Sequence, residues 1–287
     1  MSNPFASALP LPLPANTAGR SLVDELALER TSVGFARNIS PFWGIEGRIF
    51  GGYTASLALA AAAKKTGFPA LLSCHVLFLS AVRSGPVQIE VETLSQSRTA
   101  AAVRIMLKQA GVTALSAHAW LGVELAKTDS SGERLRPNPE TCAQIRFRTE
   151  VMPVMDMLDE RQVDYPETNA DFQSGLPFVD LWIRPRYAEE VDSLVSQLFD
   201  VMAFDAHMLD PTRRARTTDR IETTSMDIGI IWYSVLQAQA WRRVSVESSP
   251  SEHGYASTSG QLLDEFGSVC ARATQQGRVW HPRPAAS

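Results

Sequence analysis

The fold is decided by residues 50–65, which read FGGYTASLALAAAAKK. Gly51, Gly52 and Tyr53 open a run that is almost entirely alanine and leucine, and this predicts a helix over residues 54–65. The predicted helix is apolar on nearly every side until its two final lysines. Such a helix must be buried, most simply by a curved sheet that wraps around it.

Four segments of alternating hydrophobicity follow this helix, as is typical of strands with one buried face. They cover residues 69–82, 86–94, 98–108 and 113–123. Later in the chain, a second helical run over residues 188–208 precedes four more extended segments. These cover residues 221–232, 241–248, 254–265 and 268–280.

The two halves look like two copies of one unit. Glu92 and Glu247 occupy matching places 155 residues apart, and Gly111 and Gly267 mark similar hairpin turns. A long helix followed by antiparallel strands, present twice, predicts an α+β double hotdog fold. We expect an N-terminal repeat over residues 20–125 and a C-terminal repeat over 145–282.

The segment between the copies is less regular. Residues 127–140 are rich in Asp, Ser, Gly, Pro, Arg and Asn, which indicates a connector. Short strands are expected at 144–151 and 178–184, with irregular structure between them. Residues 211–220 are expected to form a polar loop.

Composition limits the possible functions. The chain has 287 residues, 45% of them hydrophobic, with a formal net charge of −4, which disfavours nucleic acid as a partner. Its three cysteines, an odd number without a CxxC pair, favour a reducing compartment, so we expect a cytoplasmic protein. The proline-rich residues 1–15 read as an extended arm, and no apolar helical stretch is long enough to span a membrane.

Several catalytic and cofactor motifs are missing from the sequence. A GxSxG elbow, HxxH, HExxH, paired CxxC, GxGxxG and GxxxxGK[ST] do not occur. These absences argue against a serine hydrolase, a metal site and nucleotide binding. We therefore expect neither a cofactor nor a metal.

Three polar positions in the second copy could perform chemistry together. Asp200 lies on the second predicted helix, Ser225 on a strand and Gln275 on the last strand. A sheet that wraps the helix could bring the three side chains together around a water molecule. The carboxylate would accept the proton of the water, while the hydroxyl and the amide orient it. Taken alone, an Asp in a helix usually lies on a solvated face, and a Ser or Gln in a strand usually points outward.

A family resemblance supports this hypothesis. The segments that carry it are Phe50-Gly51-Gly52, 76–80 with Gly85, Val91-Glu92-Thr93, Ser225-Met226-Asp227, Ser245-Val246-Glu247-Ser248 and Gln275-Gln276-Gly277. Through them, most of residues 20–282 resembles the acyl-CoA thioesterase II family and related double-hotdog proteins. The resemblance implies an acyl-CoA substrate and a water activated by a helix Asp, a strand Thr or Ser and a strand Gln, all within the C-terminal repeat. Placed on this chain, these roles fall on Asp200, Ser225 and Gln275.

Two other carboxylates remain alternatives to Asp200. Asp205 lies one turn further along the helix and becomes the acid if the helix register differs. Asp227 lies two residues from Ser225, on the same face of the strand. The chain also departs from the family, with Tyr53 in place of Gln and Ile228 in place of His, so the resemblance gives no acyl chain length.

Substrate-binding positions are expected outside the catalytic group. Gly51, Gly52 and Tyr53 could approach a thioester carbonyl or a pantetheine arm, although a tight strand-to-helix turn is the simpler reason for the two glycines. Arg213 and Arg214 could meet the phosphates of coenzyme A, or be solvated. The first repeat shows no carboxylate on its helix and is expected to be a scaffold.

Two other functions stay open at this point. One is a hotdog enoyl-thioester hydratase, although no suitable Asp and His pair stands out. The other is an acyl-CoA or lipid-binding protein without turnover. A homo-oligomer is expected, because the exposed sheet edges of such folds commonly pair.

Overall fold

The computed structural model describes residues 21–45, 47–128, 132–145, 155, 157–165, 175–186, 192–215, 221–250 and 253–281. The predicted N-terminal arm, residues 1–15, lies outside the described residues. No helix within these described ranges is long and apolar enough to cross a membrane.

The elements of the first half are α1 (Leu22–Glu25), β1 (Glu29–Arg30), β2 (Phe35–Ile39), η1 (Pro41–Trp43), β3 (Gly44–Ile45), β4 (Arg48–Ile49), α2 (Gly51–Thr66), β5 (Ala70–Phe78), β6 (Gly85–Gln96), β7 (Ala100–Gln109) and β8 (Val112–Gly122). Those of the second half are η2 (Pro139–Thr141), β9 (Leu158–Asp164), β10 (Phe178–Pro185), α3 (Ser193–His207), α4 (Asp210–Arg214), β11 (Glu222–Ser225), β12 (Asp227–Trp232), β13 (Arg242–Pro250), β14 (Tyr255–Leu263) and β15 (Val269–Trp280).

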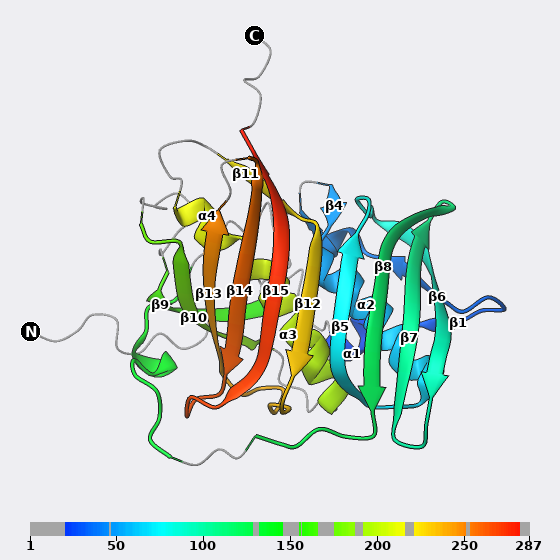
Figure 1. Ribbon diagram of the computed structural model, residues 1–287, viewed down its shortest axis with the longest axis horizontal. Coiled ribbons are helices and arrows are strands. Elements are labelled where there is room, and N and C mark those ends of the chain that lie inside the picture. The colour runs from blue at the N-terminus through cyan, green and yellow to red at the C-terminus, as the bar shows by residue number, and fades with distance from the viewer. Residues whose placement is uncertain are drawn as a thin grey trace, which may run out of the picture.

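A single large antiparallel sheet joins the two halves. Its strand order is β1-β2-β6-β7-β8-β5-β12-β15-β14-β13-β10-β9, and β11 pairs with β15. β5 and β12 lie side by side at the centre, where Ile230 pairs with Cys74, and the order of strands on either side of them is repeated (Figure 1). This arrangement confirms the predicted α+β double hotdog.

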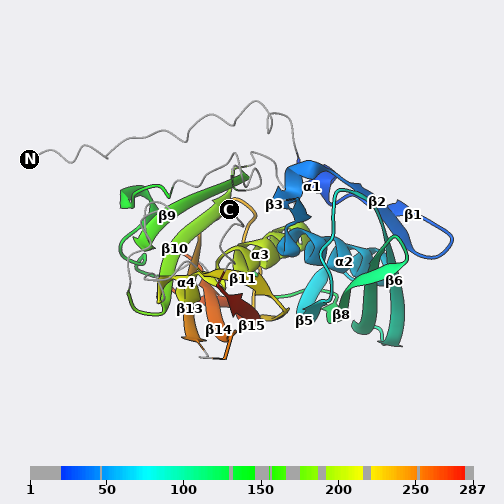
Figure 2. The ribbon, with the colours of Figure 1, turned by 90° about the horizontal axis from the view of Figure 1, so that it is seen from above.

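Helices α2 and α3 lie next to each other on one side of the sheet (Figure 2). The α2 residues from Gly52 to Ala63 are all buried, as expected for a helix that is apolar on nearly every side. The helix ends at Gly67, whose φ of 77° is the left-handed conformation that glycine adopts without strain.

The two helices run antiparallel, with close contacts between their backbones. Ser56 Oγ donates to the Leu198 carbonyl at 2.9 Å. A Cβ atom added to Gly52 would lie 2.9 Å from the Cα of Met202, so only glycine allows this approach. As a result, the first turn of α2 lies beside the last turns of α3.

Three local predictions were wrong. Residues 158–164 were expected to be irregular but form strand β9, which pairs with β10. Residues 210–214, expected within or next to a polar loop, form helix α4, whereas residues 216–220 lie outside the described part of the chain. The expected strand over 221–232 is divided at Met226 into β11 and β12.

Candidate active site

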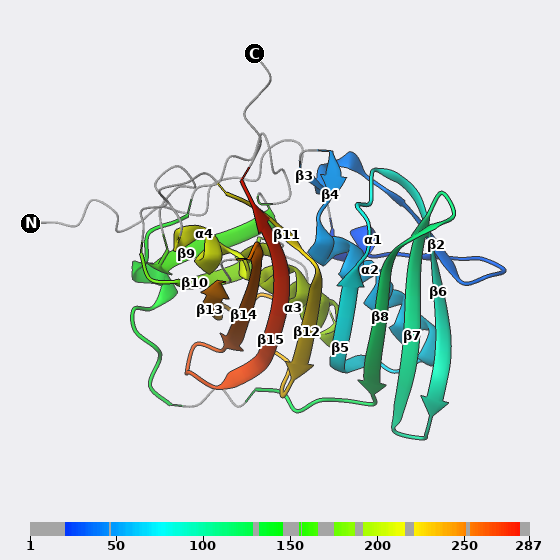
Figure 3. The same ribbon diagram turned by 45° about the horizontal axis from the view of Figure 1, so that its top comes forward.

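A carboxylate, a hydroxyl and a carboxamide meet at the junction of the two repeats. Asp205, near the end of α3, accepts hydrogen bonds at its Oδ1 from Ser225 Oγ of β11 at 3.0 Å and from Gln275 Nε2 of β15 at 2.8 Å. The backbone N–H of Gly52 also donates to this carboxylate. Figure 3 shows β11 and β15 side by side in front of α3. The grouping has the three functional groups needed to hold and deprotonate a water.

The N-terminus of α2 contributes directly to this site. Phe50, the residue that precedes the first turn, makes no side-chain capping bond. Asp205 from the other repeat supplies the missing acceptor, and its negative charge lies at the positive end of the helix dipole. A Cβ added to Gly51 would lie 2.8 Å from Asp205 Oδ2, so the glycine permits this close approach.

The surroundings of Asp205 tune its acidity. Burial raises the pKa of the Asp205 carboxyl above its ordinary value, and the hydrogen bonds from Ser225, Gln275 and Gly52 partly oppose that rise in pKa. Unlike Asp200, which is 1% exposed, Asp205 keeps part of its surface accessible. Of these two acidic residues of α3, Asp205 is therefore the more exposed.

One acceptor in the group is left without a partner. Gln275 is 1% exposed, and its Oε1 has no hydrogen-bond partner among the described residues. Its amide nitrogen donates to Asp205. The oxygen without a partner therefore lies on a side chain that is itself part of the site. A buried acceptor of this kind is costly unless something donates to it, and a water or a substrate group can do so.

Family models match both halves of the chain. One, described as the acyl-CoA thioesterase N-terminal domain, matches residues 39–122. Another, the acyl-CoA thioesterase C-terminal domain, matches residues 136–279. The chain belongs to the acyl-CoA thioesterase family. The resemblance inferred from the sequence is thereby confirmed, and so is the expected enzyme class, a thioester hydrolase.

Solved structures share the fold of this thioesterase at low sequence identity. The tesB protein of Mycobacterium avium subs paratuberculosis is 20% identical with a TM-score of 0.75, and the match covers 90% of this chain and 98% of that one. The acyl-CoA thioesterase II TesB2 of Mycobacterium marinum is 19% identical with a TM-score of 0.73, covering 92% and 99%. A hot dog fold protein of unknown function from Alicyclobacillus acidocaldarius is 17% identical with a TM-score of 0.76, covering 92% and 100%. A search of curated sequences gave no match.

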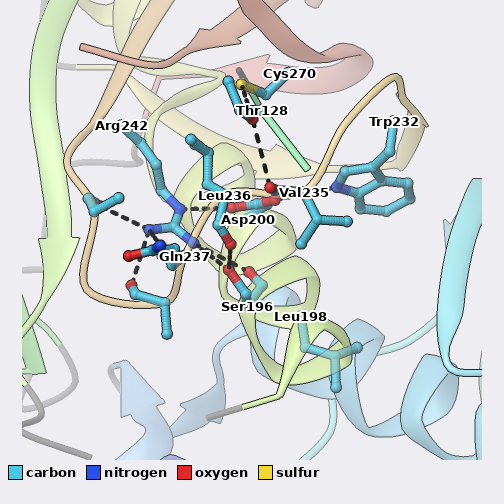
Figure 4. Close-up of polar contacts among 12 residues, drawn as sticks. Thr128, Ser196, Leu198, Asp200, Trp232, Val235, Leu236, Gln237, Arg242 and Cys270 are labelled. Carbon is cyan, nitrogen blue, oxygen red and sulfur yellow. Dashed lines mark hydrogen bonds and ion pairs between the residues drawn. The ribbon is translucent and has the colours of Figure 1, made fainter. Parts of the chain in front are cut away.

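The structure does not bring Asp200 together with Ser225 and Gln275, contrary to expectation. Its Oδ1 accepts from Arg242 Nε at 2.6 Å and its Oδ2 from Trp232 Nε1 at 3.2 Å (Figure 4). Asp200 and Arg242 are 1% and 0% exposed. In this thioesterase the carboxylate of Asp200 is committed to a buried ion pair, and Asp205, the alternative named above, takes its place beside the hydroxyl and the amide.

The separation of the two acids follows from helix geometry. Five residues advance an α-helix by about 1.4 turns, which rotates a side chain by about 140° around the axis. Asp200 and Asp205 therefore leave different sides of α3. Because α3 is buried on most sides, its hydrophobic pattern alone could not show which acid meets the strands.

Tyr53 is placed differently from the expectation that it binds substrate. It is completely buried, its ring stacks on Trp43 with centroids 3.9 Å apart, and its hydroxyl donates to the Glu25 carbonyl at 2.8 Å. These contacts hold α2 against the N-terminal segment. Packing, and not substrate contact, accounts for this side chain.

The two arginines expected to bind coenzyme A phosphates lie on α4. Arg214 donates to Asp164 Oδ1 at 2.7 Å and to the Phe178 carbonyl at 2.7 Å. Most of its donors are therefore occupied by hydrogen bonds within the protein. Within the described part of the chain, Arg213 makes one ion pair, to Asp210 at 3.2 Å, and its side chain is 43% exposed. Of the two, Arg213 retains more capacity for an external anion.

A second cluster of titratable groups lies at the end of α3. His207 contacts Glu160 at 2.7 Å and Asp210 at 3.0 Å, and Tyr165 donates to Asp210 at 2.7 Å. The two carboxylates raise the pKa of His207 to about 10 against the opposing effect of burial. All four side chains are buried, so this cluster links β9, α3 and α4 and does not face a substrate. Among the described residues, no group of His, Cys, Asp and Glu is placed to hold a metal ion.

Proposed function

We propose that the enzyme hydrolyses an acyl-CoA to a free acid and coenzyme A with a water activated by Asp205, Ser225 and Gln275. The observation that carries this proposal is the convergence of the Ser225 hydroxyl and the Gln275 amide on one carboxylate oxygen at the N-terminus of α2. The C-terminal repeat, residues 145–282, supplies the three side chains. The N-terminal repeat, residues 20–125, supplies the helix terminus and is therefore more than a scaffold.

The water binds between the carboxylate of Asp205 and the free Oε1 of Gln275. Both groups are acceptors, so they hold the two protons of the water and direct its lone pair outward, towards the substrate. Ser225 and the Gln275 amide nitrogen fix the carboxylate through their hydrogen bonds. The amide cannot titrate and so does not compete for the proton.

Hydrolysis then proceeds without a covalent enzyme intermediate. Asp205 accepts a proton as the water oxygen attacks the thioester carbonyl carbon, which forms a tetrahedral intermediate. The first turn of α2 offers the backbone N–H of Gly51 and the positive end of its dipole to the developing oxyanion, while the Gly52 N–H binds the carboxylate of Asp205. When the intermediate collapses, the C–S bond breaks and the protonated carboxyl of Asp205 returns the proton to the departing thiolate.

We also propose a coenzyme A contact, a cellular location and an assembly state for the enzyme. Arg213 is assigned to a phosphate of coenzyme A, with Arg214 holding α4 in place. Cys74, Cys142 and Cys270 are free thiols, in keeping with a cytoplasmic location. We further propose that the enzyme is a homo-oligomer, and sedimentation of the purified protein at several concentrations tests this.

The direct test is release of free thiol from a panel of acyl-CoA chain lengths by the wild-type enzyme. We expect hydrolysis of at least one member without added metal or cofactor. Binding of acyl-CoA without any thiol release would instead favour a binding protein. Hydration of an enoyl-CoA, followed as loss of its conjugated double-bond absorbance, would favour a hydratase.

The pH dependence of the rate follows from the raised pKa of Asp205. Only the deprotonated carboxylate accepts the proton, so kcat/KM should fall as the pH drops through this pKa. The acid limb should lie at higher pH than the ordinary value of an exposed aspartate, near 3.8. Ser225→Ala removes a hydrogen-bond donor that lowers the pKa of Asp205. In this variant the acid limb of kcat/KM should therefore shift to still higher pH. A limb that stays in place in this variant would contradict the assignment.

A methyl group on Gly51 should disturb the acid directly. Gly51→Ala places the methyl 2.8 Å from Asp205 Oδ2 and 3.2 Å from the ring of Phe78. We expect kcat to fall by about 10-fold or more, because displacement of a catalytic group by a fraction of an ångström is costly. Gly122→Ala is the matched control, since its methyl meets only the flexible end of Leu72 at 3.2 Å. Equal kcat values for the two variants would contradict the role of Gly51.

A further inference from the structure

The strand that carries Ser225 contains an extra residue beside the site. Ser225 pairs with Gly277, and Gly229 pairs with Thr274. Residues 226–228 therefore face only residues 275–276 of β15. This two-to-three mismatch is a β-bulge, a device that changes the direction of side chains and is frequent next to active sites.

The bulge determines which side chain reaches Asp205. On β12, Ile228 and Ile230 point towards the helices and are 0% and 1% exposed. Regular alternation would place Met226 on the same inner face. Instead Met226 is 38% exposed, and Ser225 points inward to Asp205. Without the extra residue, the hydroxyl would lie on the outer face of the sheet.

The bulge leaves one donor of β15 without its usual acceptor. Met226 N–H donates to the Gln276 carbonyl at 2.8 Å, but the Met226 carbonyl turns to β5 and accepts from Phe78 N–H at 2.9 Å. The N–H of Gln276 therefore does not donate to the Met226 carbonyl, as it would in a regular antiparallel pair. Asp227 Oδ1 accepts it at 2.7 Å, a charge-assisted bond of the shorter kind.

We propose that Asp227 is a positioning residue that locks this bulge and thereby orients both Ser225 and Gln275. Its bond fixes the backbone of Gln276, the residue next to Gln275, to the strand two residues beyond Ser225. This role replaces the alternative in which Asp227 is the acid, because its carboxylate is bound to the backbone on the opposite side of the strand from Asp205. The proposal rests on the proposed function for its kinetic consequence.

Three variants test the role of Asp227. Asp227→Ala removes the acceptor and should lower kcat by about 10- to 100-fold with little change in KM, because the reacting groups shift but the substrate contacts stay. Asp227→Asn keeps an oxygen that accepts from Gln276 and should retain kcat within about threefold. His75→Ala removes only the neighbour at 3.5 Å from Asp227 Oδ2 and should leave kcat unchanged.

Hydrogen exchange of the Gln276 backbone amide, followed by NMR, provides a readout that does not depend on activity. Exchange should be slow in the wild type and in Asp227→Asn, and faster in Asp227→Ala. Wild-type kcat in Asp227→Ala, or equal losses in the Ala and Asn variants, would overturn the proposal. If Asp227→Ala does not fold, Asp227→Asn still tests the proposal. Its kcat should stay within about threefold of the wild-type value, and a larger loss would overturn the proposal. Should the wild type hydrolyse no acyl-CoA, the proposed function fails, while the exchange rates still test the bond.

Discussion

Asp205→Asn is expected to lower kcat for acyl-CoA hydrolysis by about 10²- to 10⁴-fold, the usual contribution of a general base. The amide has nearly the shape of the carboxylate, and its oxygen can still accept from Ser225, Gln275 or Gly52. What it loses is the capacity to take a proton from the water. Steady-state thiol release measures the effect, with KM expected to change little.

The controls for this variant separate chemistry from folding. Asp205→Asn should unfold at a temperature close to that of the wild type, because the amide is nearly isosteric with the carboxylate and its oxygen can still accept a hydrogen bond. Ser225→Ala and Gln275→Leu should each reduce kcat less than Asp205→Asn, since they orient the acid and the water without accepting the proton. Undiminished hydrolysis by Asp205→Asn would refute the assignment of this residue as the base.

The fold could be predicted because the signal lies in local patterns that are repeated. The Ala/Leu-rich run after Gly52 has no exposed face, and the strands on either side of Gly111 and Gly267 alternate with period two. Both patterns can still be recognised when the predicted ends of a helix or strand are wrong by a few residues. β9 was missed because Leu158–Asp164 is mostly charged, and its carboxylates are stabilised by arginines and a histidine from elsewhere, such as Arg184 on Asp159.

The site was harder to predict because it depends on a rotation about a helix axis. The types of residue, one acid with Ser225 and Gln275, could be inferred from the strands and the family resemblance. The choice between Asp200 and Asp205 could not, since both lie in a helix buried on most sides. A signal was nevertheless available in Arg242: a buried arginine on a strand requires an acid partner, and Asp200 is that partner.

Asp200→Ala is expected to destabilise the protein by about 3–5 kcal/mol, because it leaves the charge of Arg242 buried without its counter-ion. The guanidinium is 0% exposed, and its other donors bind Ser196 Oγ at 2.6 Å and the carbonyls of Ala238 and Ala240 at 3.0 and 2.8 Å. It therefore cannot move to water without breaking the loop before β13. Denaturant unfolding measures the loss.

A double-mutant cycle completes the test of the Asp200–Arg242 pair. Arg242→Met alone should cost a similar amount of stability. It leaves the buried carboxylate of Asp200 without its counter-ion, and it removes the hydrogen-bond donors of the loop carbonyls. Asp200→Ala with Arg242→Met should be less destabilised than the sum of the two single changes, since no buried charge remains. If Asp200→Ala instead kept wild-type stability and lost hydrolysis, Asp200 would be the catalytic acid after all. The structure predicts the reverse, because this carboxylate already has a cation and an indole N–H as partners and almost no exposed surface.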